Sequence, residues 1–266
     1  MNILKTIANY KLTEVEANKA LKPIKSLEKS PFFQRRPLSF TQALLNPKAY
    51  GIIAEFKRQS PSKGIINDAA PVMQTVKGYA AAGASVVSVL TDNNFFGGSN
   101  EDILSIREGC TCPILRKDFI VDEYQIVEAK AIGADVILLI AAILTPKQIE
   151  HLAAFAKKLE LSVLLEVHDK EELERSPNDW VDVIGVNNRN LQDFTVDLQK
   201  SFELSPLIPD RFLKISESAI TEAKTIHDLR AVGYQGFLIG ERFMHQAQPE
   251  QGLAQFIEDI KNYRVQ

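Results

Sequence analysis

Cysteine is scarce in this sequence of 266 residues, and its scarcity argues against two kinds of site. Only one residue separates the two cysteines, Cys110 and Cys112, so they form neither a CxxC redox motif nor half of a zinc motif, and no second pair exists. The four histidines are scattered along the chain. We therefore expect two reduced thiols at the start of a strand, and no metal.

Long apolar runs and an excess of basic charge are also missing. No stretch approaches the length that spans a membrane, and residues 1–20 mix charged with apolar side chains, unlike a signal peptide. Lysine and arginine total 31 against 34 aspartates and glutamates, which gives a formal net charge of -3. The sequence thus predicts a cytoplasmic protein that binds neither nucleic acid nor a membrane.

Eight short, apolar segments rich in β-branched residues recur along the chain, separated by segments of helical character. Nearly continuous apolar runs of this kind are typical of parallel strands covered on both faces. The eight segments are Gly51–Arg58, Ser85–Asp92, Cys112–Phe119, Asp135–Ile143, Ser162–Asp169, Asp182–Asn190, Phe212–Ile220 and Gly236–Met244.

Helix signals lie between these segments. Asp122 and Gln125 have the spacing of a capping box. Gly83, Gly133 and Gly233 each end a helical pattern, and they are separated by multiples of a unit of roughly 25 residues. Strand and helix that alternate at such a repeat predict a parallel α/β fold.

We predict one α/β domain: a (β/α)8 TIM barrel in residues 49–266 that follows an N-terminal helical extension in residues 1–48. A doubly wound sheet is the competing fold, but the polar loop QSPSKG follows the first strand where that fold would have a GxGxxG turn. In the extension, the apolar stripe of Ile3, Leu4 and Ile7 either docks on the barrel or binds a partner.

Polar residues end five of the eight strand segments. Alternate residues of a strand share a face, and the carboxyl ends of barrel strands converge on one mouth, where active sites lie. Lysines and glutamates packed there shift each other's pKa values, which suits proton transfer. The polar residues are Glu55, Lys57, Lys117, Glu166, Asn187 and Glu217, and the apolar Phe119 shares a face with Lys117.

Two further patterns lie near the strand ends. His168 shares a strand face with Glu166, but one such pair without other ligands does not predict a metal site. The segments ISESAI and FLIGERFM follow the pattern of a barrel phosphate site, in which Gly240 would let the backbone approach the phosphate. An ordinary strand-to-helix turn explains them equally well.

Several blocks of this sequence together resemble indole-3-glycerol phosphate synthase. They include IIAEFKRQSPSKG, SVLTDNNFFGGS, ILRKDFIVDEYQI, LLEVHD and IGVNNRNL, and the match runs in order from about residue 50 to the C-terminus. The resemblance implies a lyase of tryptophan biosynthesis. Its substrate would be the small phosphorylated molecule 1-(2-carboxyphenylamino)-1-deoxyribulose 5-phosphate, and the enzyme would close the indole ring with loss of carbon dioxide and water, without a metal or an organic cofactor.

The resemblance also implies roles for individual residues. Lys117 would be the general acid that protonates the ketone, and Glu166 would be the general base in the dehydration. Lys57 would bind the substrate carboxylate and assist proton transfer, while Glu55 would position both lysines.

The implied binding residues fall into three groups. Those at the sugar hydroxyls and the developing charge are Asn187 and Glu217, with Arg189 and Leu191 nearby. Those around the aromatic ring are Phe96, Phe119 and Leu138. Those around the phosphate are Ser60, Ser218, Ala219, Gly240 and Glu241, together with Lys57.

For two of the residues predicted to surround the phosphate, Ala219 and Glu241, we make a further prediction. The family usually reads ESGI where this chain has Glu217-Ser218-Ala219-Ile220. An alanine at negative φ still offers its N–H to a phosphate, so we expect an ordinary negative φ at Ala219. We expect the Glu241 carboxylate to point away from the phosphate, because two anions in one small site repel.

Two other functions remain open. One is a class I aldolase that uses Lys117 as a Schiff-base nucleophile, and the other is a non-catalytic phosphate-binding barrel that acts as a regulator. We expect the protein itself to be a monomer or a weak homo-oligomer.

Overall fold

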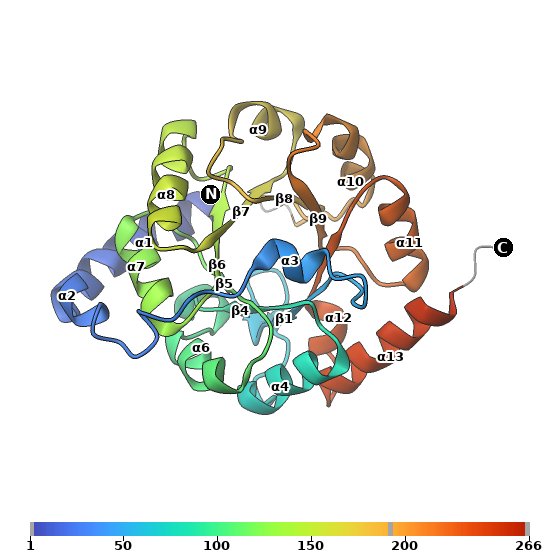
Figure 1. Ribbon diagram of the computed structural model, residues 1–266, viewed down its shortest axis with the longest axis horizontal. Coiled ribbons are helices and arrows are strands. Elements are labelled where there is room, and N and C mark those ends of the chain that lie inside the picture. Colours follow the sequence, from blue (N-terminus) through green and yellow to red (C-terminus); the bar gives the residue numbers. More distant parts are fainter. Residues whose placement is uncertain (1–2, 191–193, 264–266) are drawn as a thin grey trace.

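Eight parallel strands form a closed barrel in the computed structural model, which describes residues 3–190 and 194–263 (Figure 1). The strands neighbour one another in chain order, and the last pairs with the first. The predicted (β/α)8 barrel is confirmed, and each predicted segment contains one strand. These are β1 Ile52–Phe56, β4 Val86–Leu90, β5 Ile114–Lys117, β6 Val136–Ile140, β7 Ser162–Val167, β8 Val183–Asn187, β9 Leu213–Glu217 and β10 Gly236–Ile239.

A helix follows each barrel strand and covers its outer face. The eight helices are α4 Val72–Ala82, α6 Asn100–Ile106, α7 Glu123–Ile132, α8 Pro146–Lys158, α9 Lys170–Arg175, α10 Gln199–Leu204, α11 Ala223–Ala231 and α13 Pro249–Asn262. The connections also hold α5 Asn93–Phe96, α12 Glu241–Met244, two 3-10 turns at Arg107–Gly109 and Ser205–Leu207, and an antiparallel pair of β2 Gln59–Ser60 with β3 Gly64–Ile65.

Local sequence signals account for where the helices begin and end. The predicted capping box of Asp122 and Gln125 begins α7, since both of its reciprocal hydrogen bonds are present. Gly83 and Gly133 end α4 and α7 at φ values of 105° and 91°. Glycine reaches this left-handed conformation without the strain that a side chain causes.

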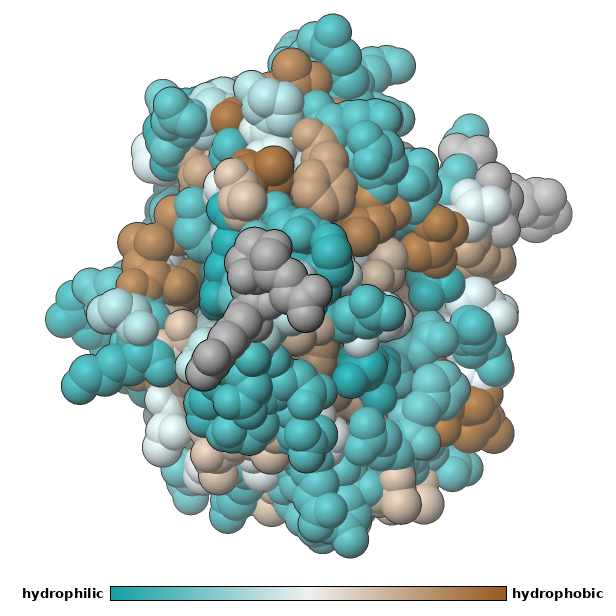
Figure 2. Space-filling view, turned by 90° about the vertical axis from the view of Figure 1, so that its right-hand side faces the viewer, coloured by the Kyte–Doolittle hydropathy of each residue, from teal (hydrophilic) through white to brown (hydrophobic). Residues whose placement is uncertain are grey.

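The helices turn their apolar sides toward the barrel. Ile226 and Leu229 of α11, and Leu253 and Phe256 of α13, are buried. The outer face over α10, α11 and α13 is largely hydrophilic, with apolar side chains in small separate groups (Figure 2). Within residues 3–190 and 194–263, no helix combines the length and apolar character needed to cross a membrane.

Inside the barrel, apolar side chains fill the centre and polar side chains follow them toward the carboxyl ends of the strands. The apolar layer includes Ile53, Val86, Leu115, Leu164 and Ile215, which belong to one buried cluster. Alternate residues of a strand share a face, so the residues two positions further along also point inward. They are Glu55, Ser88, Lys117, Glu166 and Glu217.

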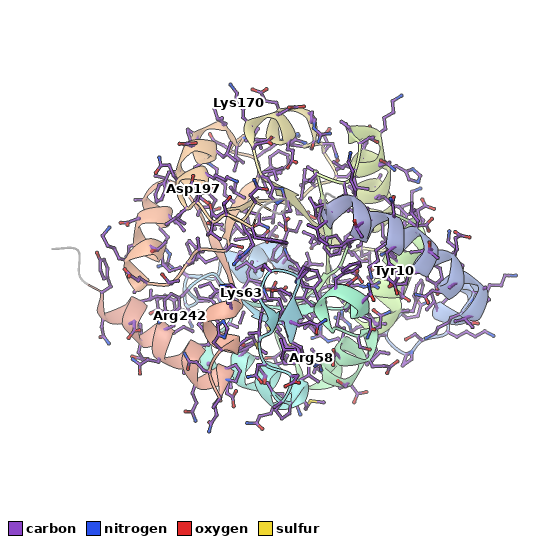
Figure 3. All side chains as sticks on the ribbon, turned by 180° about the vertical axis from the view of Figure 1, so that it is seen from behind. Tyr10, Arg58, Lys63, Lys170, Asp197 and Arg242 are labelled. Carbon is purple, nitrogen blue, oxygen red and sulfur yellow. The ribbon has the colours of Figure 1, made fainter. Side chains whose placement is uncertain are left out.

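The chain before the barrel forms α1 Ile3–Leu21, α2 Ile24–Leu27 and α3 Phe40–Leu44. Figure 3 shows α1 crossing the end of the barrel at which Arg58 and Lys63 lie. Leu4 and Ile7 of α1 are buried in the same cluster as the barrel interior. The apolar stripe of the N-terminal extension therefore docks on the barrel mouth.

A buried cluster of charges holds α1 in this place. Lys11 is completely buried, and its Nζ lies 3.0 Å from Asp92 Oδ2, 3.0 Å from Asp118 Oδ1 and 2.8 Å from Glu14 Oε1. Burial alone would lower the pKa of Lys11, but these carboxylates raise it above its usual value, so the ammonium stays charged. Because Asp118 directly follows Lys117, the cluster ties α1 to a loop of the mouth.

Candidate active site

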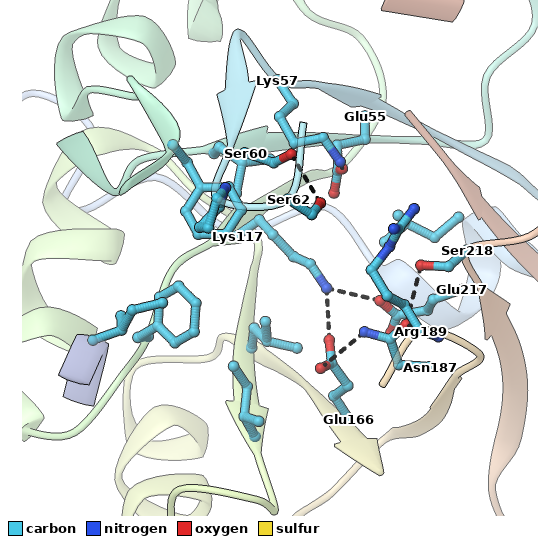
Figure 4. Close-up of a pocket in the computed structure, with 18 of the residues that line it drawn as sticks. Glu55, Lys57, Ser60, Ser62, Lys117, Glu166, Asn187, Arg189, Glu217 and Ser218 are labelled. Carbon is cyan, nitrogen blue, oxygen red and sulfur yellow. Dashed lines mark hydrogen bonds and ion pairs between the residues drawn. The ribbon is translucent and has the colours of Figure 1, made fainter. Parts of the chain in front are cut away.

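Lys117, at the end of β5, lies at the centre of the barrel mouth. Its Nζ is 2.8 Å from Glu166 Oε2 and 2.7 Å from Glu217 Oε2, so one ammonium bridges the ends of β7 and β9 (Figure 4). Burial alone would lower the pKa of Lys117, but the charges of Glu166, Glu217 and Glu55 outweigh it and raise that pKa. Lys117 is therefore protonated and positively charged where it lines the cavity.

Asn187, at the end of β8, connects this ion triad to the loop after β9. Its Nδ2 donates to Glu166 Oε1 over 3.2 Å, and its Oδ1 accepts from the Ser218 hydroxyl over 3.0 Å. The same Oδ1 accepts from the Arg189 backbone N–H over 3.0 Å. The amide is thus fixed by its neighbours, and Glu166 keeps one orientation.

The two carboxylates beside Lys117 differ in their ionisation. Burial alone would raise the pKa of Glu166, but the positive charges of Lys117 and His168 lower it to about 2. Burial raises the pKa of Glu217, the positive charge of Lys117 lowers it, and the negative charge of Glu166 raises it again. The resulting pKa is about 7. A site whose two carboxyl groups differ in this way can use them for different tasks.

The raised pKa of Glu217 predicts a pH-dependent contribution to stability. The folded protein holds this proton more tightly than the unfolded chain, whose ordinary pKa is 4.5. This stabilisation is therefore full below pH 4.5 and is lost as the pH rises toward 7. Urea unfolding across this range should show a fall in the free energy of unfolding that Glu217→Gln lacks. Parallel profiles for the two proteins would show that Glu217 ionises normally.

Two glycines make room for the carboxylates of the mouth. A Cβ at Gly185 would lie 2.4 Å from Glu217 Oε1, and one at Gly240 would lie 2.8 Å from Glu55 Oε1. Glu55 in turn accepts a hydrogen bond from Lys57 Nζ over 2.8 Å. Both carboxylates therefore need a neighbour without a side chain in order to reach their positions.

An apolar slot lies beside the ion triad. The rings of Phe96 and Phe119 have centroids 5.8 Å apart, and Leu138 lines the same cavity. Leu4 and Ile7 of α1 also line this cavity. The sequence left open whether they dock on the barrel or bind a partner, and their part in the site was missed, although their helical spacing was the available signal.

A second cavity adjoins the first at the ends of β9 and β10. Ser218, Ala219, Gly240 and Glu241 line it, and Lys57 lies on the side shared with the first cavity. Small residues and a cation around one cavity fit a phosphate group. Apart from Leu191, which lies outside the described residues, every residue predicted for the site lines one of the two cavities.

The prediction of a negative φ at Ala219 is wrong, because its φ is 64°. The preceding residue, Ser218, has a φ of 68°. Asn188 holds this turn, since its Nδ2 donates to the Glu217 carbonyl over 3.0 Å and to the Ser218 carbonyl over 3.2 Å. The turn after β9 is thus imposed by its surroundings and overrides the preference of alanine.

Replacing Ala219 by glycine should therefore stabilise the protein, by up to about 1 kcal/mol, because glycine adopts positive φ without strain. Ala154 lies in the middle of α8, and Ala154→Gly should have the opposite sign and cost about 1 kcal/mol. Urea unfolding of both variants measures the difference. An Ala219→Gly protein less stable than the parent would show that this turn is not strained.

The expectation that Glu241 points away from the cavity is also wrong. Glu241 lines both cavities, and its Oε2 accepts from Arg189 Nη2 over 3.0 Å, while its Oε1 lies 3.4 Å from Lys63 Nζ. Burial would raise the pKa of Glu241, but these two cations lower it. Attraction to Arg189 and Lys63 thus decides the position of the Glu241 carboxylate.

Metal ligands do not gather in the part of the chain that the structure describes. No group of three His, Cys, Asp or Glu side chains is arranged to hold a metal ion there. His168 Nε2 lies 3.4 Å from Glu166 Oε1, as the shared strand face predicted, and its other ring nitrogen lies 3.2 Å from Glu172 Oε2.

Acidic and basic groups at the carboxyl ends of barrel strands, beside an apolar slot and a second cavity that Lys57 and Arg189 help to line, define a TIM-barrel enzyme suited to proton-transfer chemistry. The model of one family, described as indole-3-glycerol phosphate synthase, matches residues 4–256. The chain belongs to the indole-3-glycerol phosphate synthase family, which makes it a lyase of tryptophan biosynthesis.

Curated relatives carry the same description along their whole length. The indole-3-glycerol phosphate synthase of Bacteroides thetaiotaomicron is 45% identical over 260 residues, which cover 98% of this chain and 99% of the relative. That of Burkholderia ambifaria is 41% identical over 256 residues, with 95% and 98% covered.

A solved structure supports the fold alone. The 3-hexulose-6-phosphate synthase from Salmonella typhimurium superposes with a TM-score of 0.61 at 12% identity, covering 79% of this chain and 99% of that one.

Proposed function

We propose that this site converts 1-(2-carboxyphenylamino)-1-deoxyribulose 5-phosphate into indole-3-glycerol phosphate, with loss of one carbon dioxide and one water. The observation that carries the proposal is the Lys117 ammonium held between Glu166 and Glu217 beside an apolar slot. The slot suits the anilino ring, and the adjoining cavity suits the phosphate.

Lys117 starts the reaction by protonating the substrate ketone. Two carboxylates keep its ammonium charged in a buried place, which supports Lys117 as the proton donor to a ketone bound in the cavity. Glu55 holds Lys57 through a hydrogen bond of 2.8 Å, and Lys57 binds the substrate carboxylate. Oppositely charged partners thus position both lysines.

Glu166 acts as base in the dehydration. Its low pKa keeps it ionised in the resting site, and Lys117 is the cation first responsible for lowering that pKa. Once Lys117 has given its proton to the substrate, this cation is neutral and the proton affinity of Glu166 rises. The first proton transfer therefore prepares the base for the second.

Other residues bind the parts of the substrate that do not react. Asn187 and Glu217 hold the sugar hydroxyls and the developing charge. The anilino ring packs between Phe96, Phe119 and Leu138, and the phosphate lies beside Ser218. The remaining binding residues of the proposal are Ser60, Arg189 and Glu241, the backbones of Ala219 and Gly240, and Leu191 outside the described residues.

A ring-closure assay tests this function. Indole fluorescence should develop when the purified protein meets the substrate, whereas a non-catalytic phosphate-binding barrel would give none. Borohydride separates the synthase from a class I aldolase, because reduction with a carbonyl substrate should leave Lys117 unmodified. A trapped adduct on Lys117 would favour the aldolase.

We also propose that the enzyme works in the cytoplasm, as a monomer or a weak homo-oligomer. The free thiols support the compartment: Cys110 and Cys112 have sulfur atoms 3.6 Å apart and are not joined, as is usual where thiols are kept reduced.

A further inference from the structure

One completely buried lysine joins three segments at the barrel mouth. Lys11 belongs to α1, and its Nζ lies 3.0 Å from Asp92 Oδ2, after β4, and 3.0 Å from Asp118 Oδ1, after β5. The other oxygen of Asp118, Oδ2, accepts hydrogen bonds from Thr91 over 2.6 Å and from Arg116 over 3.2 Å. Asp118 is therefore fixed on the barrel, and Lys11 ties the other two segments to it.

Each of the two aspartates also holds an aromatic residue of the apolar slot. Asp92 caps α5, and its Oδ1 accepts a hydrogen bond from the backbone N–H of Phe96 over 3.2 Å. Asp118 Oδ1 accepts one from the backbone N–H of Phe119 over 2.8 Å. The Lys11 ammonium thus lies between the two carboxylates that fix the backbone of the two slot rings.

The helix that carries Lys11 supplies a further wall of the slot. Leu4, Ile7 and Lys11 recur at helical spacing, so they share one face of α1. Leu4 and Ile7 line the same cavity as the two rings. The ring of Tyr10 packs edge-on against that of Phe95, with centroids 5.6 Å apart, so α1 also contacts α5 directly. Much of the slot is therefore built from segments that meet at Lys11.

The charge of Lys11 is what allows these segments to meet. Asp92 is completely buried, and among residues 3–190 and 194–263 Lys11 is its only ion-pair partner. Asp118 is buried as well, and one oxygen of each carboxylate lies 3.0 Å from the same nitrogen. Without the ammonium, the two carboxylates would repel each other at close range in a place where solvent does not screen them.

We propose that Lys11 is a positioning residue that assembles the apolar slot and thereby sets the affinity for the aromatic ring of the substrate; this rests on the proposed function. Lys11 lines neither cavity, so it acts through Asp92 and Asp118. In the described part of the chain, the second cavity, proposed for the phosphate, has no lining residue from α1, from α5 or from the loop after β5. Loss of Lys11 therefore weakens ring binding and leaves phosphate binding unchanged.

The test compares Lys11→Met with Lys5→Met, which makes the same change at an exposed lysine of the same helix. Two competitive inhibitors of ring closure report on the two cavities: N-methyl-2-aminobenzoate on the slot and inorganic phosphate on its neighbour. In Lys11→Met, we expect Ki to rise roughly tenfold for N-methyl-2-aminobenzoate, the scale of a lost aromatic contact, and to stay within about twofold for phosphate. Lys5→Met should match the parent with both.

The steady-state constants of the variant should divide in the same way. KM for the substrate should rise in Lys11→Met, because the slot binds the ring less tightly. The value of kcat should change much less, since Lys117 keeps its ion pairs with Glu166 and Glu217. A general loss of folded protein would lower the apparent kcat and leave KM and both Ki values unaltered.

A double variant separates positioning from stability, because Lys11→Met leaves two buried carboxylates without their shared cation. When Asp92→Asn is added to Lys11→Met, the net charge of the cluster returns to that of the parent, and asparagine can still cap α5. The double variant should melt closer to the parent than Lys11→Met does, yet keep the raised Ki for N-methyl-2-aminobenzoate. If Lys11→Met does not fold, the double variant is compared with the parent, and the same difference between the two inhibitors decides.

Three results would overturn the proposal while the proposed function stands. One is a parent-like Ki for N-methyl-2-aminobenzoate in a folded Lys11→Met protein. Another is an equal rise of both Ki values. The third is recovery of ring affinity in the double variant, which would show that Lys11 only neutralises charge. A parent protein that closes no ring would refute the proposed function, and this role of Lys11 with it.

Discussion

Lys117→Met should lower kcat by roughly a hundredfold or more, the usual scale for removal of a general acid. Methionine keeps the length and apolar stem of lysine but has no proton to give. The melting temperature should change little, because Lys117 faces the cavity and Glu217, whose pKa is already raised, can take up a proton when the cation is removed.

The matched control for this variant is Lys158→Met. Lys158 is exposed at the end of α8, so the same chemical change there should leave turnover unaltered. Steady-state indole fluorescence measures both variants. If Lys117→Met kept more than about a tenth of the parent activity, Lys117 could not be the general acid.

Glu166→Gln should lose kcat while substrate affinity stays close to that of the parent. Glutamine has the shape of glutamate, and its one amide oxygen can still accept a hydrogen bond from Lys117 or from Asn187, but it cannot accept a proton. Because the lost interaction acts in the transition state, the fall in kcat should be roughly a hundredfold or more. Equilibrium binding of substrate and single-turnover kinetics separate the two quantities.

Glu171→Gln supplies the control, since Glu171 is an exposed residue in the first turn of α9. It should match the parent in kcat and in Kd. A large rise in Kd with unchanged kcat in Glu166→Gln would assign Glu166 to substrate binding and would leave the base of the dehydration to another residue.

The strand ends explain why so much of this site could be predicted from sequence. Inside a barrel strand the side-chain direction alternates, so an apolar residue such as Leu115 or Leu164 fixes the face of Lys117 or Glu166 two positions later. The barrel then brings those faces to one mouth. The local pattern and the topology of a barrel are together sufficient to predict where these groups lie.

The features that sequence missed depend on contacts between distant segments. Lys11 forms ion pairs with Asp92 and Asp118 only because α1 docks on the barrel mouth. The sequence of α1 does not indicate which residues these partners would be. Ala219 takes positive φ because Asn188, on the loop after β8, holds the turn. Alanine by itself favours a negative φ, so a prediction based only on the residue type at position 219 gave the wrong sign.

The most direct test of the central claim follows the substrate carboxylate. The purified protein is mixed with 1-(2-carboxyphenylamino)-1-deoxyribulose 5-phosphate carrying a carbon-13 label in that group, and gas and solution are analysed by mass spectrometry. We predict one labelled carbon dioxide for each molecule of indole-3-glycerol phosphate, and, in the same time, at most about a hundredth as much of either product with Lys117→Met. Substrate that binds but keeps its labelled carboxylate, with no indole formed, would contradict the account.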